Sequence, residues 1–189
     1  MPRIRGASIG EHHEMVWDGL AQAIRELLGE RDYDAITMGH IAERTGLARN
    51  TLYNYGRDKS ALILALTERA GRPTVAQVAA TARSDRNAAD RMREIIAIVL
   101  EAFRDPALQL MFRPGSLPNP FHAIVAEVEN VVRDGIARGE FHQVADVSLA
   151  VELLSGVMRA GAERIGRDPS ALAATTGAAR EIILAGLTR

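Results

Sequence analysis

TMGHIAERTGLARNTLYNY, residues 37–55, is the stretch that decides the fold of this chain. Apolar residues fall at helical spacing on both sides of Gly46, where glycine permits a tight turn with positive φ. Thr37 is a good N-cap for the first of the two helices. His40 stands where a capping box takes Glu or Gln, so we expect that box to be incomplete. With a second helix expected at about 48–54, the stretch predicts two short helices joined by a tight turn.

The second of these helices is polar on one side and apolar on the other. Leu47 and Leu52 supply its apolar side. Arginine donates to the edge of guanine in the major groove and asparagine pairs with the edge of adenine, whereas hydroxyls and amines bind phosphates. The charged residues from Arg44 to Lys59 are mostly cations, although the formal net charge of the chain is −1. We therefore expect this stretch to bind DNA through a local basic surface. The polar residues are Arg49, Asn50, Thr51, Tyr53 and Tyr55.

The rest of the chain predicts helices and no strands. Apolar positions recur at three- and four-residue steps, without lasting alternation. Pro73 is expected to interrupt or kink the helix that begins at Lys59, and we place a coarse boundary between residues 57 and 72. The fold class is therefore all-α. Further helices are expected at about 11–28, 75–83, 87–104, 107–112, 120–138, 146–165 and 170–187.

Composition narrows the class of protein. The 189 residues are 47% hydrophobic and 25% charged, which is typical of a globular chain. Cysteine is absent, so disulfides and thiolate zinc sites are excluded. The N-terminus has no signal-peptide pattern and the longest apolar stretch, 95–100, is too short to cross a bilayer, so we expect a cytoplasmic protein without a membrane partner. Catalytic fingerprints are also absent, and we predict no enzyme activity, no metal and no cofactor.

The N-terminal third resembles the TetR family of transcription regulators. The resemblance rests on YDAITM at 33–38, IAERTGL at 41–47, TLYNY at 51–55 and KSAL at 59–62, and covers about residues 12–66. It implies a three-helix helix-turn-helix DNA-binding head at 1–57 and a helical effector-binding and dimerisation domain at 58–189.

The resemblance also implies roles for individual residues. Thr37 and Lys59 would bind phosphates, and Tyr53 and Tyr55 would hold the DNA backbone. Bases or nearby phosphates would be contacted by Arg49, Asn50 and Thr51. The residues implied to enclose a small-molecule effector are Phe103, Met111, Phe112, Phe121, His122 and Met158.

As a regulator of this kind, the protein would be a repressor. It would bind palindromic double-stranded operator DNA as a homodimer and leave it when the effector binds. The dimer would form through the last two helices, whose apolar faces include Val151, Gly161, Ala179, Ile182 and Ile183.

Two departures from the family pattern support an alternative hypothesis. Ala48 replaces the usual Ser or Thr and cannot cap the second helix, and Gly56 replaces the usual Phe, which removes an anchor and loosens the segment. The alternative is a dimeric helical interaction module whose DNA-binding head has decayed.

Overall fold

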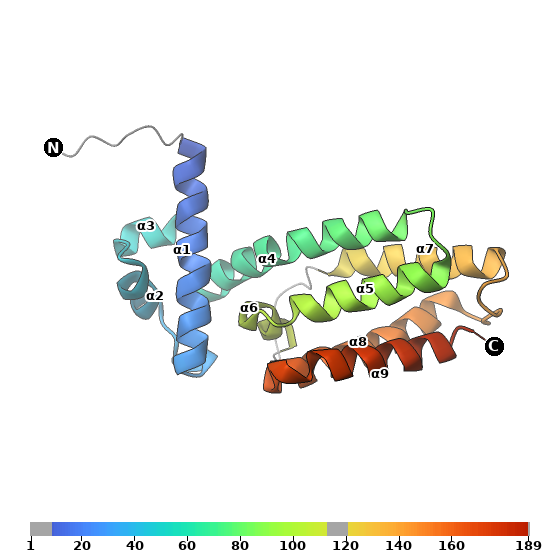
Figure 1. Ribbon diagram of the computed structural model, residues 1–189. Coiled ribbons are helices and arrows are strands. Elements are labelled where there is room, and N and C mark those ends of the chain that lie inside the picture. Colours follow the sequence, from blue (N-terminus) through green and yellow to red (C-terminus); the bar gives the residue numbers. More distant parts are fainter. Residues whose placement is uncertain (1–8, 113–120, 189) are drawn as a thin grey trace. The chain divides into compact units, whose positions relative to one another are not determined.

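The computed structural model describes residues 9–112 and 121–188, and every regular element within them is a helix (Figure 1). The all-α prediction is confirmed. Three short 3-10 turns, Tyr33–Ala35, Leu110–Phe112 and Pro169–Ala171, connect the α-helices. None of the described helices is long and apolar enough to span a membrane. The α-helices are α1 (Ile9–Glu30), α2 (Met38–Thr45), α3 (Arg49–Tyr53), α4 (Lys59–Ala82), α5 (Ala88–Ala102), α6 (Pro106–Gln109), α7 (His122–Ala137), α8 (Val147–Arg167) and α9 (Leu172–Ala185).

The chain forms two compact units, which divide within α4 after Glu68. The N-terminal unit holds α1 to α3 and the start of α4, and the C-terminal unit holds the remaining helices. The assignment of DNA binding to 1–57 and of effector binding and dimerisation to 58–189 stays a prediction.

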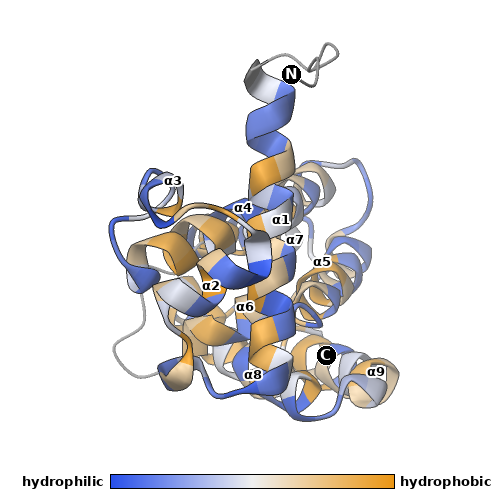
Figure 2. Cartoon of the chain, turned by 90° about the vertical axis from the view of Figure 1, so that its left-hand side faces the viewer, coloured by the Kyte–Doolittle hydropathy of each residue, from blue (hydrophilic) through white to orange (hydrophobic). Residues whose placement is uncertain are grey.

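The N-terminal unit is built on one apolar stripe of α1. Polar and apolar bands follow each other along this helix, as Figure 2 shows. Leu20, Ile24 and Leu27 of the stripe are almost fully buried, together with Ile41 of α2 and Leu52 of α3. Burying each such side chain stabilises the fold by about 1.5–3 kcal/mol. This small core therefore fixes α2 and α3 against α1.

The C-terminal unit is organised around α5, which packs against α7, α8 and α9. A buried arginine joins three helices at one end of this unit. Arg91 of α5 donates to the backbone carbonyl of Ala82 in α4 at 2.8 Å and forms an ion pair with Asp134 of α7. At the other end, Gln109 donates to the carbonyls of Phe103 and Ala162, at 2.6 and 2.9 Å.

Of the two alternatives expected at Pro73, the interruption is wrong, because α4 is one helix of 24 residues that contains the proline; the kink stays a prediction. The segments expected before Pro73 and at 75–83 are parts of this helix. Proline removes one helical hydrogen bond, but Pro73 is exposed, so water can reach the carbonyl that is left. Leu66 and Val78 on either side of it are buried, and their packing outweighs the lost bond. The helix expected at about 11–28 is α1, which continues to Glu30.

Candidate nucleic-acid interface and ligand cavity

The first helix of the predicted pair begins with a complete capping box. Thr37 Oγ1 accepts a hydrogen bond from the His40 backbone N–H at 3.2 Å, and the Thr37 N–H donates to His40 Nδ1 at 3.3 Å. The expectation of an incomplete box is therefore wrong. An unprotonated imidazole nitrogen accepts the hydrogen bond that a Glu or Gln side chain would accept.

The turn between α2 and α3 has the conformation that the sequence predicts. Gly46 has φ of 68°, which confirms the positive φ. Thr45 Oγ1 donates to the Ile41 carbonyl at 2.8 Å and accepts from the Leu47 N–H at 3.4 Å, so one hydroxyl joins the end of α2 to the turn. Ala48 is the N-cap of α3 and provides no side-chain cap, as expected.

One side of α3 is exposed and polar. Leu52 points into the core and is fully buried, whereas half of the Tyr53 surface is accessible to solvent. The Arg49 guanidinium lies against the first turn of α2, where its Nη2 is 3.1 Å from the place that a Cβ on Gly39 would take. Thr37 and Arg49 border the same open hollow between α2 and α3. The exposed residues on α3 include Arg49, Asn50, Thr51 and Tyr53.

The other two predicted DNA contacts, Tyr55 and Lys59, also touch the protein. The Tyr55 ring stacks on His13 with a centroid distance of 5.3 Å and meets Trp17 edge-on at 5.0 Å. Lys59 Nζ donates to the carbonyl of Tyr33 at 2.9 Å and lies 4.1 Å from the centroid of the Tyr33 ring. The ammonium group has three donors, so it can bind a phosphate in addition to this carbonyl.

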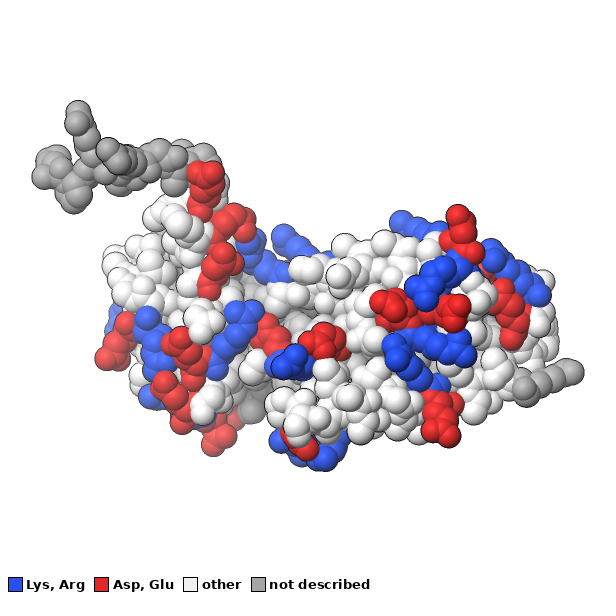
Figure 3. Space-filling view, viewed as in Figure 1, with Lys and Arg blue, Asp and Glu red and all other residues white. Residues whose placement is uncertain are grey.

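The local excess of cations is smaller than the sequence count indicates. Arg44 forms ion pairs with Glu30 at 2.6 Å and Glu26 at 3.0 Å, both in α1. These pairs raise the pKa of Arg44, and the hydrogen bond from Arg44 lowers the pKa of Glu30. Arg57 lies 3.4 Å from Asp58. Figure 3 likewise shows carboxylates among the cations of the N-terminal unit on the visible face.

Gly56 packs closely instead of loosening its segment, which corrects the prediction. It is buried, and a Cβ at this position would lie 2.6 Å from the backbone N and Cα of Leu62 in α4. The backbone of α4 therefore approaches residue 56 too closely for a side chain to fit here without a shift.

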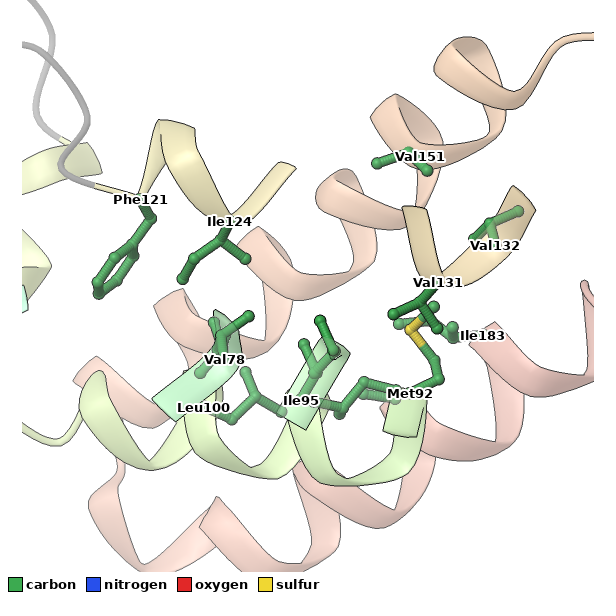
Figure 4. Close-up of a cluster of buried hydrophobic side chains, with 14 of the residues drawn as sticks. Val78, Met92, Ile95, Leu100, Phe121, Ile124, Val131, Val132, Val151 and Ile183 are labelled. Atoms are coloured by element: carbon green, nitrogen blue, oxygen red, sulfur yellow. The ribbon is translucent and has the colours of Figure 1, made fainter. Parts of the chain in front are cut away.

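The C-terminal unit contains a cavity of about 430 Å³ among α5, α7, α8 and α9. Figure 4 shows Phe121, the N-cap of α7, and Ile124 of α7 on one side of this region and Ile95 of α5 on the other. The Phe103 ring lies 5.1 Å from Phe112 and 5.4 Å from Phe121, measured between centroids. The cavity is thus lined by an aromatic cluster and aliphatic side chains.

Five of the six residues predicted for the effector pocket line this cavity: Phe103, Met111, Phe112, Phe121 and Met158. The sixth, His122, is exposed at the first residue of α7 and lies outside the described lining. The prediction missed Ser155 and Arg159 of α8, which also line it. The signal was helical spacing, because these residues follow Val151 at steps of four on the same side of α8.

Some apolar residues of α8 and α9 are buried in the core, and others are exposed on the surface. Val151, Ala179 and Ile183, which were predicted to form a dimer interface, are buried within the unit itself. That part of the prediction is wrong for these side chains, because they belong to the hydrophobic core of the C-terminal unit. The large apolar residues left exposed on α8 and α9 are Leu149 at 53%, Leu153 at 66% and Ile182 at 58%.

Comparison with known families agrees with the geometry of the N-terminal unit. Residues 20–66 match the family described as "Bacterial regulatory proteins, tetR family". Residues 20–66 therefore carry the N-terminal region of the TetR family. This match confirms the resemblance over the helix-turn-helix stretch. Comparison with curated protein sequences gives no match.

Solved structures of regulators share the fold over most of the chain. FadR from Bacillus subtilis, in complex with stearoyl-CoA, is 17% identical with a TM-score of 0.76, covering 92% of this chain and 98% of that one. The MbdR regulator from Azoarcus sp. CIB is 19% identical with a TM-score of 0.74, covering 92% and 100%. SmeT, the repressor of the Stenotrophomonas maltophilia multidrug efflux pump SmeDEF, is 18% identical with a TM-score of 0.73, covering 92% and 90%.

Proposed function

We propose that this protein is a TetR-family repressor that binds palindromic operator DNA as a homodimer and leaves it when a small molecule fills the cavity. The observation that carries the DNA-binding role is α3. Its Leu52 is buried, while Arg49, Asn50 and Thr51 are exposed in a row at the helix start. A helix anchored on one side and polar on the other fits the major groove.

The contacts to DNA divide into base readers and phosphate binders. Arg49 and Asn50 carry the donors and acceptors that distinguish guanine and adenine edges. Thr37, at the start of α2, and Lys59, at the start of α4, bind phosphates together with the helix N-terminal amides. Tyr53 and Tyr55 hold the DNA backbone, and the rings of His13 and Trp17 position Tyr55.

The dimer forms through the exposed apolar residues of α8 and α9. Two recognition helices must reach major grooves about 34–36 Å apart, which a symmetric dimer achieves. Leu153→Glu places a charge on the most exposed of these residues and is expected to give monomers in sedimentation velocity. Met15→Glu is the matched control, because Met15 is also exposed, at 58%, but lies on α1. Dimers of the Leu153 variant at wild-type strength would contradict this interface.

The effector occupies the cavity of the C-terminal unit. Its volume of about 430 Å³ lies within the range of roughly 300–1,000 Å³ that is usual for small-molecule sites. A ligand that favours the conformation with lower DNA affinity releases the DNA, and by linkage DNA weakens ligand binding by the same factor. The presence of stearoyl-CoA in the FadR complex supports a small-molecule effector for this fold.

The experiment that tests DNA binding is a fluorescence-anisotropy titration across a salt series. It compares DNA from upstream of the gene with the same DNA scrambled. The wild type is expected to prefer the upstream fragment, and Arg49→Ala is expected to lose that preference. Arg57→Ala is the control, because Arg57 is exposed and lies outside α3. Equal, weak binding of both fragments by the wild type, with no preferred sequence in a genome-wide selection, would favour the interaction-module alternative.

A further inference from the structure

The wall of the cavity is apolar apart from a few groups on α8. Methionine, phenylalanine, isoleucine, leucine and valine side chains form most of it. Ser155 and Arg159 are its polar side chains among the described residues, and none of those residues is acidic. The Ser155 hydroxyl donates to the Val151 carbonyl at 2.8 Å, so that donor is used within α8. Arg159 is therefore the one charged group that the described lining presents to a ligand.

Arg159 is held where the cavity meets solvent. Its side chain is 62% exposed, yet it lines the cavity. The guanidinium carbon lies 5.6 Å from the centroid of the Phe112 ring, which is within the range of a cation–π contact. Its Nε donates to Glu163 Oε1 at 2.9 Å. These two contacts restrain the guanidinium.

The hydrogen bond to Glu163 occupies only one of the N–H donors of Arg159. A guanidinium has five N–H groups, and the bond to Glu163 uses the one on Nε. The Nη groups form a planar fork that matches the two oxygens of a carboxylate.

We propose that the cavity binds an amphipathic carboxylate, whose alkyl or aryl body lies among the Phe and Met side chains and whose carboxylate pairs with Arg159. This inference rests on the ligand cavity of the proposed function and specifies its ligand class. Burial of the apolar body provides most of the affinity, because the wall offers it no hydrogen bonds. The cation at the edge selects the anionic head group and disfavours cationic amphiphiles.

The test uses three probes with the same ten-carbon chain and different head groups: decanoate, decanamide and decyltrimethylammonium. Isothermal titration calorimetry of the full-length protein, without DNA and below the concentrations at which the probes aggregate, measures each Kd. Decanoate is expected to bind about fivefold more tightly than decanamide, as for a partly exposed ion pair, and the cation most weakly. Arg159→Gln is expected to abolish the preference for decanoate, whereas Arg159→Lys retains part of it.

Arg164→Gln is the matched control. Arg164 lies on the same helix and pairs with Asp168 at 3.1 Å, but it is not a lining residue. The Arg164→Gln variant should prefer decanoate over decanamide as strongly as the wild type does. Three results would overturn the inference: an unchanged preference in Arg159→Gln, equal or tighter binding of decanamide or of the cation, or no binding of decanoate. Because no DNA is present, these results are distinct from a failure of the anisotropy test, which would overturn the DNA-binding role alone.

Discussion

Replacing Gly56 by alanine tests the close packing of the segment between α3 and α4. The added Cβ would lie 2.6 Å from the N, Cα and Cβ atoms of Leu62, whereas ordinary contacts begin at 3.4 Å. Leu62 is fully buried, and two of these three atoms belong to the backbone of α4, so a side-chain rotation cannot relieve the overlap. Overpacking of this kind costs about 1–3 kcal/mol.

The expected result of Gly56→Ala is a lower melting temperature. For a chain of this size each kcal/mol lowers Tm by roughly 2–4 °C, which differential scanning calorimetry resolves. DNA affinity should fall as well, because the strain acts on the segment that joins α3 to α4. The anisotropy titration with the upstream fragment measures this second effect.

Gly19→Ala is the control for this substitution. Gly19 lies within α1 in the same unit, and no atom lies within 4 Å of a Cβ at this position. Alanine in a helix interior is favoured over glycine by about 0.5–1 kcal/mol, so this variant should melt at a higher temperature. If Gly56→Ala also melts at or above the wild-type temperature, the close approach to Leu62 is not a constraint and the reasoning is refuted.

Three further substitutions have defined outcomes. Lys59→Met should weaken binding to every DNA sequence and reduce the slope of log K against log salt by about one, since one phosphate contact is lost, and an unchanged slope would reject that contact. Ala48→Ser should stabilise the protein by about 1 kcal/mol in urea titrations by capping α3, and Ala48→Val, which cannot cap, should not. The hydrogen bond from Arg91 lowers the pKa of Asp134, so its ionised form stabilises the fold above about pH 4, and this stability is lost as the pH falls through the lower, folded-state pKa. Asp134→Asn should therefore lower stability at neutral pH and flatten its loss in acid, and a curve parallel to that of the wild type would contradict this assignment.

Features that depend on neighbouring residues were predictable from the sequence. The Thr37 cap and the positive φ of Gly46 are both local, because a cap bonds within three residues and a turn is decided by the residue in it. The order and approximate bounds of the helices follow from apolar spacing for the same reason. All three phenylalanines in the described lining of the cavity were also found, since large apolar side chains on amphipathic helices are buried. Helix α3 and its polar face therefore belong to the part that the sequence determined.

The tertiary structure decided which groups meet across helices. Arg44 was counted as a free cation, but two carboxylates of α1 neutralise it. Val151 and Leu153 are both apolar in the sequence, yet the core of the C-terminal unit encloses the first and leaves the second exposed. Arg159 borders the cavity because α8 passes beside Phe112. Charge pairing and burial depend on the neighbours that packing brings together, and a helical period specifies a face without specifying what covers it.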